Sequence, residues 1–200
     1  MSINSEGYFN CLRSYLNTNN YEVTKRDSGR IVLEEKVYWP GEPDPRNQKV
    51  RLGYGGDVIV IRLDIKNQRG NSDPLFHFLE DEAKPWAKRC DFVIFQHVNN
   101  RINIYCIEFK SAKFQDSAVD QLNASVSWCR ALHNIIKLYT SKAKRLSLRK
   151  YVFTCMNDPS PYVDAGGYLK RDHSIRHFHY DDLTAITLEE LENTNIERVG

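Results

Sequence analysis

Residues 91–113 decide the fold: Asp91-Phe-Val-Ile-Phe-Gln-His-Val98, then Asn99-Asn100, then Arg101-Ile-Asn-Ile-Tyr-Cys-Ile-Glu-Phe-Lys110 and Ser111-Ala-Lys113. Two runs rich in β-branched and aromatic residues flank the Asn pair. Asn tolerates the positive φ that a two-residue type I′ turn requires at both central positions. The stretch therefore predicts a β-hairpin with its turn at Asn99-Asn100.

This turn fixes which residues face each other across the hairpin. The numbers of facing residues add up to 199, so Asp91 lies opposite Glu108. Opposed side chains stand about 4.5–5.5 Å apart at Cβ, and like charges there are destabilising unless something binds between them. A divalent cation would suit that position. Lys110 shares a face with Glu108, whereas Phe109 points to the other face.

The spacing of these residues resembles the signature of the PD-(D/E)xK nuclease superfamily, which includes restriction endonucleases and Holliday-junction resolvases. Asp91 is followed by Glu108-Phe109-Lys110 at the end of the next strand, and Cys90 stands where the family's name has Pro. The resemblance covers residues 75–156. It implies an α/β fold with a restriction endonuclease-like core, a mixed central β-sheet in the order αβββαβ flanked by helices.

The resemblance also implies a metal-dependent endonuclease. Asp91 and Glu108 would hold Mg²⁺, for which Mn²⁺ can substitute, and the backbone carbonyl of Phe109 would be a further ligand. Lys110 would orient the attacking water and stabilise the developing negative charge. Gln121 would assist, as a Gln on the same helix does in RecB-like relatives; the alternative is an ordinary polar residue of the helix.

A third acid is common in this family, and several acids could fill the role here. The candidates are Glu34, Glu35, Glu80 and Glu82, of which Glu80 is favoured because it leads into the core. Asp57 with Asp64-Ile65-Lys66 imitates the main motif, but no turn separates its two acids, so they cannot face each other. The alternative for the main motif itself is a solvated strand end carrying a surface salt bridge.

Length and composition indicate one globular domain. The chain has 200 residues, 41% of them apolar and 27% charged, enough to bury a core. No apolar run approaches the ~20 residues that span a bilayer, and the N-terminus lacks a signal-like apolar core. We therefore expect a cytoplasmic protein that does not contact membranes. The five scattered cysteines predict free thiols without zinc spacing.

The predicted elements surround the hairpin on both sides. Apolar residues at helical spacing predict an opening helix at 3–16 and a long helix at 116–139. Strands are expected at 21–23, 30–38, 57–65, 75–79 and 151–156, with an edge strand at 174–180 and a final acidic helix at 188–192. We predict a single domain over 1–200, whose core at 75–156 is preceded by a helix and extra strands in 1–74 and followed by an extension at 157–200.

Basic residues gather after the long helix, and no acidic residue occurs between Gln121 and Asn157. Such a segment suits phosphate contacts, although a solubilising loop has the same composition. The residues expected to bind nucleic acid are Lys142, Lys144, Arg145, Arg149 and Lys150. His173, His177 and His179 lack the spacing of a zinc site and fit a nucleic-acid contact better.

The expected function is cleavage of phosphodiester bonds in nucleic acid, DNA in preference to RNA. A chain of this size without a recognition domain fits defence, restriction or repair, acting with a partner protein or as a homodimer. The alternative is a nuclease-fold subunit that has lost activity and binds nucleic acid or protein. The intact Asp, Glu and Lys set argues against that alternative.

Overall fold

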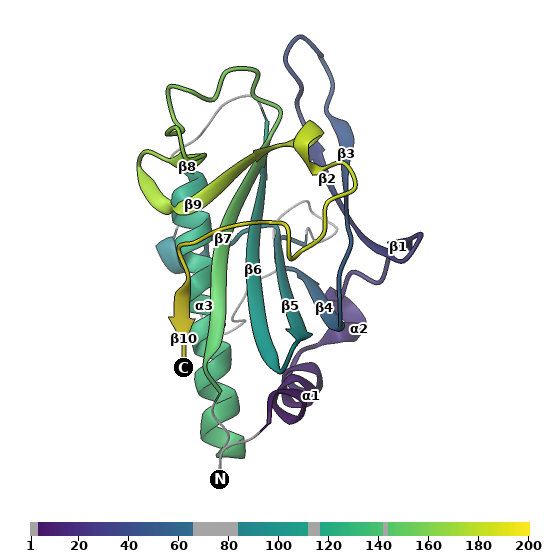
Figure 1. The fold of residues 1–200 in the computed structure, drawn as a ribbon, viewed down its shortest axis with the longest axis vertical. Helices are drawn as coiled ribbons and strands as arrows, with labels where there is room; N and C mark the ends of the chain where they lie inside the picture. Colours follow the sequence, from purple (N-terminus) through teal and green to yellow (C-terminus); the bar gives the residue numbers. More distant parts are fainter. Residues whose placement is uncertain (1–3, 66–83, 112–116, 142–143) are drawn as a thin grey trace.

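The structure is a computed structural model that describes residues 4–65, 84–111, 117–141 and 144–200. Within these ranges the main sheet is mixed and seven-stranded, in the order β4-β5-β6-β7-β9-β8, with β10 also paired to β7 (Figure 1). Its strands are β4 (Asp57–Arg62), β5 (Phe92–Val98), β6 (Arg101–Lys110), β7 (Leu146–Thr154), β8 (Tyr168–Leu169), β9 (Asp172–His179) and β10 (Glu197–Val199).

A smaller sheet and a few helices complete the described chain. The small sheet has the order β1-β2-β3 and contains β1 (Arg26–Asp27), β2 (Arg30–Val37) and β3 (Arg46–Leu52). The α-helices are α1 (Ser5–Tyr15), α2 (Thr18–Tyr21) and α3 (Ser117–Thr140), and two 3₁₀ turns are η1 (Pro85–Ala87) and η2 (Tyr180–Leu183). No helix in these parts of the chain has the length and apolar character needed to cross a bilayer.

The β5–β6 hairpin forms as its turn residues predict. Asn99 and Asn100 adopt φ values of 49° and 56°, which are typical of a type I′ turn. The strands pair from Val98 with Arg101 to Phe92 with Ile107. Asp91 and Glu108 are next in this register, so the predicted alignment of the two acids is confirmed.

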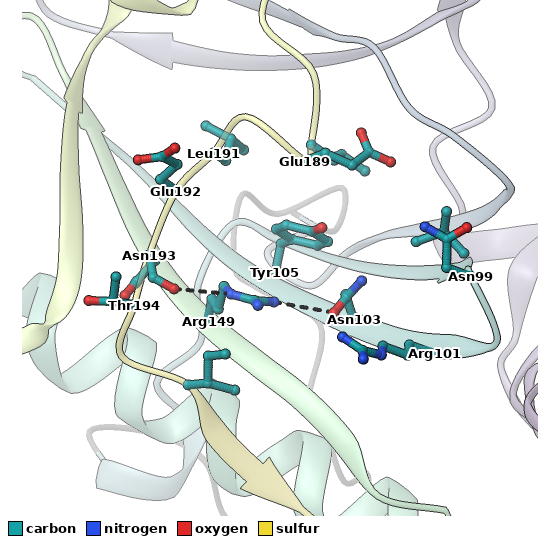
Figure 2. Close-up of a pocket in the computed structure, with 13 residues that line it drawn as sticks. Asn99, Arg101, Asn103, Tyr105, Arg149, Glu189, Leu191, Glu192, Asn193 and Thr194 are labelled. Carbon is teal, nitrogen blue, oxygen red and sulfur yellow. Dashed lines mark hydrogen bonds between the residues drawn. The ribbon is translucent and has the colours of Figure 1, made fainter.

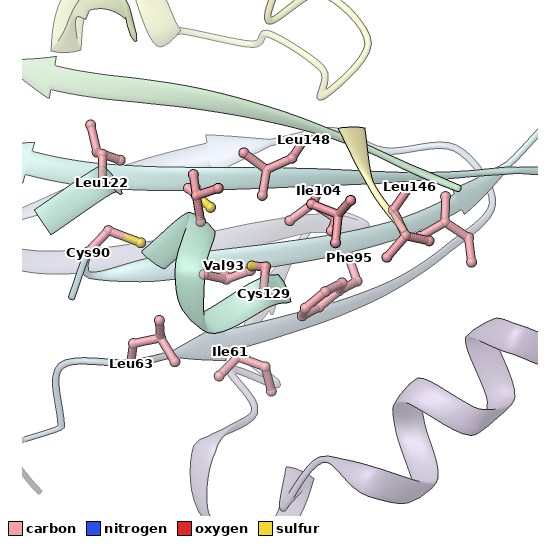
Figure 3. Close-up of a cluster of buried hydrophobic side chains, with 14 of the residues drawn as sticks. Ile61, Leu63, Cys90, Val93, Phe95, Ile104, Leu122, Cys129, Leu146 and Leu148 are labelled. Atoms are coloured by element: carbon pink, nitrogen blue, oxygen red, sulfur yellow. The ribbon is translucent and has the colours of Figure 1, made fainter. Parts of the chain in front are cut away.

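Helix α3 covers one face of the sheet and connects β6 to the parallel strand β7. Its buried residues Leu122, Val126, Cys129 and Ile136 join strand residues and part of α1 in one apolar cluster. Figure 3 shows Leu122 and Cys129 among side chains of the sheet. The long amphipathic helix predicted from the sequence is therefore confirmed, and its apolar stripe is the side that packs.

The opposite face of the sheet is also buried. There β2, β3 and the segment after β9 cover a second apolar cluster that includes Phe92, Ile107, Phe109 and Phe153 (Figure 1). Burial on both faces explains why residues 92–95 of β5, 104–107 of β6 and 151–153 of β7 are continuously apolar instead of alternating.

Three predicted strands differ from the structure or fall outside it. The strand expected at 75–79 lies outside the described residues. On the side of β5 away from β6, the neighbouring strand is β4, which begins at Asp57. Strand β7 begins at Leu146, five residues before the expected start, and β9 is no edge strand because β7 and β8 flank it.

Two short elements also differ from expectation. Tyr21 ends the short helix α2 instead of starting a strand. Residues 188–192 form turns and not a helix, because the backbone there is tied to Gly53: Gly53 N–H donates to Ile186 O and Leu188 N–H donates to Gly53 O. Leu188 and Leu191 then pack into the second cluster. The five cysteines are free, as predicted.

Candidate active site

The candidate site lies at the end of the sheet opposite the Asn99-Asn100 turn. Asp91 directly precedes β5, and Lys110 is the last residue of β6. Because the two strands are antiparallel, the start of one and the end of the other meet at the same edge. The structure therefore brings Asp91, Glu108 and Lys110 together, as their spacing predicts.

The side chains of Asp91 and Glu108 each accept a hydrogen bond from the backbone of the other strand. The carboxylate of Asp91 accepts a hydrogen bond of 2.6 Å from the N–H of Phe109, and Glu108 Oε2 accepts one of 3.1 Å from the N–H of Asp91. The relative exposure is 7% for Asp91 and 1% for Glu108. This geometry fixes both side chains before any ligand arrives.

Lys110 is held from two directions. Its Nζ lies 2.5 Å from Glu108 Oε1 and donates a hydrogen bond of 2.8 Å to Gln121 Oε1. Gln121 is fixed in turn, because its Nε2 donates to the carbonyl of Arg89 at 3.1 Å. Tyr180 donates to the Lys110 carbonyl at 3.0 Å. The predicted proximity of Gln121 to the site is thus observed, and Tyr180 is a partner that the sequence did not suggest.

Burial dominates the electrostatics of the two acids. It raises the pKa of Asp91 well above its usual range, and the negative charge of Glu108 raises that pKa further. Burial also raises the pKa of Glu108, to about 7, although Lys110 lowers it. The pair therefore retains a proton near neutral pH when no cation is bound, because two buried carboxylates disfavour double ionisation.

One acid on the neighbouring strand β2 lies near this pair and could serve as a third ligand. The charge of Glu35 on β2 contributes to raising the pKa of Asp91, and Glu35 Oε2 is 2.6 Å from Arg62 Nη2. Glu34 instead contacts Lys25 and Lys49 at 2.5 and 3.4 Å. Of the acids considered from the sequence, Glu35 is therefore placed best among those described.

The favoured candidate from the sequence, Glu80, and its alternative Glu82 lie outside the described residues. Asp64, which belonged to the discounted imitation motif, contributes to raising the pKa of Glu108. Asp57, the other acid of that motif, lies opposite His97 near the turn end of the sheet. Leu63 N–H donates to Asp91 O. This hydrogen bond joins the chain after β4 to the chain before β5 and so places Asp64 near the two acids. No local sequence motif indicates that position of Asp64.

The donor set fits a hard cation. Two carboxylates suit Mg²⁺, which keeps several waters and uses one or two protein carboxylates together with substrate phosphates. Among the described residues no group of three or more His, Cys, Asp or Glu side chains is arranged to hold a metal ion. Asp91 and Glu108 would hold the ion through their carboxylates, and a role for the Phe109 carbonyl stays a prediction.

Most of the predicted nucleic-acid contacts lie away from this site. Strand β7 runs parallel to β6, with Thr154 beside Lys110, so Lys144 and Arg145, which precede β7, lie at the turn end. That end is about 26 Å away at 3.3 Å per residue. Lys142 is outside the described residues. The basic segment therefore does not border Asp91 and Glu108.

The expectation for Lys150 is wrong. Its side chain is 3% exposed and its Nζ lies 3.1 Å from Asp172 and 3.1 Å from Glu197. Alternation along β7 directs Lys150 toward α3, where Asn123 accepts from it at 2.6 Å. Arg149 points to the opposite face and bonds Asn103 and Asn193 instead. Adjacent residues of a strand cannot form one continuous surface patch.

The histidines of β9 divide between two places. His177 contacts Thr154 Oγ1 through its Nε2 at 2.8 Å, and Thr154 pairs with Lys110, so His177 belongs to the site end. Burial lowers its pKa to about 4, which makes it neutral at physiological pH. His173 instead contacts Asp164 at 2.9 Å.

Comparison of the chain with family models, with curated proteins and with solved structures finds no match in any of the three. The assignment of a function therefore rests on the residues and geometry of the site.

Proposed function

We propose that this protein is a metal-dependent nuclease that hydrolyses phosphodiester bonds in nucleic acid, DNA in preference to RNA. The observation that carries the proposal is the pair Asp91 and Glu108, buried side by side at a sheet end and each bonded to the other strand's backbone. Lys110 and Gln121 complete the set. A buried pair of acids with raised pKa values beside a positioned lysine is an arrangement typical of functional sites.

The order of elements supports the same proposal. After α1, and with α2 and the small sheet β1–β3 inserted before them, β4, β5 and β6 follow as antiparallel neighbours, and then α3 and the parallel strand β7. We interpret this part as a restriction endonuclease-like core. The acids lie where the second and third of its strands meet, which is also the position that the sequence resemblance implies.

Asp91 and Glu108 would hold Mg²⁺ through carboxylate oxygens, and loss of the shared proton would accompany its binding. When bound, the ion supplies a water of lowered pKa and offsets negative charge on the phosphate. Lys110 is the group of this chain that donates hydrogen bonds to the reacting atoms. Gln121 is a positioning residue, since it holds Lys110 and is itself held by Arg89.

A second candidate is a binding module with this fold and no activity. The observation in its favour is that Asp91 and Glu108 are almost fully buried and already have internal partners. Buried acids of this kind also occur as structural networks. Activity and metal dependence separate the two candidates, because the binding module predicts nucleic-acid binding without cleavage.

The test is cleavage by purified protein. Supercoiled plasmid, single-stranded DNA and an RNA transcript are each incubated with Mg²⁺, with Mn²⁺ and with EDTA. The nuclease proposal predicts nicking of plasmid with either metal and none with EDTA or with Glu108→Gln. Asn134→Ala, at an exposed position on α3, is the control prepared in parallel and should cleave like the wild type. Absence of cleavage of all three substrates would contradict the proposal.

A further inference from the structure

A cavity of about 580 Å³ lies at the turn end of the sheet, on the face opposite α3. Its walls are the first half of β6, Arg149 of β7 and residues 188–196 (Figure 2). From Arg101 to Glu108 the strand covers about 23 Å at 3.3 Å per residue, and alternation places Tyr105 and Glu108 on opposite faces. The cavity is therefore separate from the candidate active site.

Arginines form one wall of this cavity. Arg149 is partly buried and is held by two hydrogen bonds, from Nε to Asn193 O at 3.1 Å and from Nη1 to Asn103 Oδ1 at 3.2 Å. In the described parts of the chain, neither Arg149 nor Arg101 has a carboxylate within ion-pair distance. A guanidinium withdrawn from water without a counter-ion favours an anion, and its planar fork fits phosphate oxygens.

An aromatic ring forms the floor. Tyr105 donates a hydrogen bond of 2.8 Å to Gln96 Oε1, and its ring stacks on Tyr151 with centroids 6.0 Å apart. Leu188, Leu191 and Ile196 add apolar surface to the lining. Tyr105 is 3% exposed, so it closes the bottom of the cavity with little ring surface, and the more exposed Ile196 adds an apolar side that suits a flat, weakly polar group.

Carboxylates lie across from the arginines. Figure 2 shows Glu189, Leu191 and Glu192 on one side of Tyr105, with Arg101 and Arg149 on the other. Glu189 is held in place because its Oε1 accepts from Gln96 Nε2 at 2.6 Å and from Gly55 N–H at 3.1 Å. Carboxylates accept hydrogen bonds from N–H donors such as the amino and imino groups of a nucleobase.

We propose that this cavity binds a purine mononucleotide, with its phosphate on Arg101 and Arg149, its base against Tyr105 and the donors of the base toward Glu189 and Glu192. The volume falls within the range of about 300–1,000 Å³ that is typical of small-molecule sites. An inorganic phosphate would contact neither the apolar floor nor the carboxylates. A nucleoside would leave the arginines without an anion.

The probe is GMP, titrated into the full chain by calorimetry in EDTA so that no divalent ion bridges it to Asp91 and Glu108. Guanosine and inorganic phosphate are titrated separately. GMP should bind at least about tenfold more tightly than either part, because each part makes only some of the contacts and loses at least one charge-assisted hydrogen bond or the apolar contact of the base. Equal binding of GMP and phosphate would overturn the proposal, and so would no binding of GMP.

Variants locate the binding. Arg149→Gln and the exposed Arg101→Ala should each weaken GMP binding about tenfold or more, whereas Arg51→Ala, on β3, should leave it unchanged. Arg101→Ala alone decides the matter if Arg149→Gln does not fold. Equal losses in Arg101→Ala and Arg51→Ala would mean non-specific attraction and overturn the site. The result is independent of nuclease activity, because these titrations contain no metal and measure no cleavage.

Discussion

Asp91 and Glu108 accept reciprocal hydrogen bonds across the β5–β6 hairpin, Asp91 from the N–H of Phe109 and Glu108 from the N–H of Asp91. Asp91 is thus held by the backbone of β6, and Glu108 by the backbone at the start of β5. The arrangement is a consequence of the Asn99-Asn100 turn, because that turn sets the register that places the two acids opposite each other.

Replacement of Glu108 should affect stability according to the contacts that the new side chain keeps. Glu108→Ala removes the acceptor for the buried N–H of Asp91 and one partner of Lys110, so we expect a loss of about 1–3 kcal/mol, the cost of leaving a buried donor unsatisfied. Glu108→Gln keeps an acceptor and should lose less. Urea unfolding at pH 7 in EDTA measures both variants. Equal stability of Glu108→Ala and the wild type would show that these contacts contribute nothing.

Stability without metal should fall as the pH rises from about 4.5 to about 7. The pKa of Glu108 is about 7 in the folded protein and near 4.5 when unfolded, so the folded state binds the extra proton in this window. Stability is then complete below the unfolded pKa and decreases until the folded pKa is passed. At about 1.36 kcal/mol per pKa unit, the loss in free energy of unfolding is of the order of 3 kcal/mol. The raised pKa of Asp91 changes the stability in the same direction.

The comparison of wild type with Glu108→Gln isolates this effect from the other titrating groups. Unfolding midpoints are measured in EDTA from pH 4.5 to 8.5 for both proteins. The difference in free energy of unfolding should shift in favour of Glu108→Gln with increasing pH. A difference in free energy of unfolding that is constant over this pH range would mean that Glu108 is ionised throughout. Asp91 and Glu108 would then share no proton.

Gln121→Met should lower kcat for DNA cleavage about tenfold or more and leave KM nearly unchanged, because Gln121 orients Lys110 and the proposed role of Lys110 is in the chemical step. The variant Asn134→Ala, elsewhere on α3, is its control. Gln121→Glu keeps an acceptor for Lys110 and should recover part of the rate. A rise in KM with unchanged kcat would instead assign Gln121 to substrate binding.

Local turn chemistry explains what could be predicted from the sequence. Two consecutive asparagines between β-type runs determine the hairpin, its register and the meeting of Asp91 with Glu108. The positions of Glu35 and Asp64 depend on how β2 packs and β4 pairs beside the hairpin, and no local pattern encodes that. Lys150 was misjudged for a similar reason, since its partner Asp172 arrives from a strand 22 residues later.

The double variant Lys144→Ala, Arg145→Ala should leave nucleic-acid affinity within about twofold of wild type. Both residues precede β7 at the end of the sheet remote from Asp91. The slope of log K against log salt should also stay unchanged, because each lost phosphate contact would reduce it by about 0.9 for duplex DNA. Fluorescence anisotropy from 50 to 200 mM salt provides the measurement. A flatter slope would show that the substrate extends along the sheet to this end.

The central claim is that Asp91 and Glu108 form a site for a divalent cation, and binding of Mn²⁺ followed by electron paramagnetic resonance tests it most directly. Wild-type protein should bind one Mn²⁺ with an affinity that increases as the pH rises through about 7, because the ion competes with the proton shared by the acids. Asp91→Asn and Glu108→Gln should lose this binding while Asn134→Ala retains it. Binding that is equal in all four proteins, or absent from the wild type at pH 8, would contradict the account.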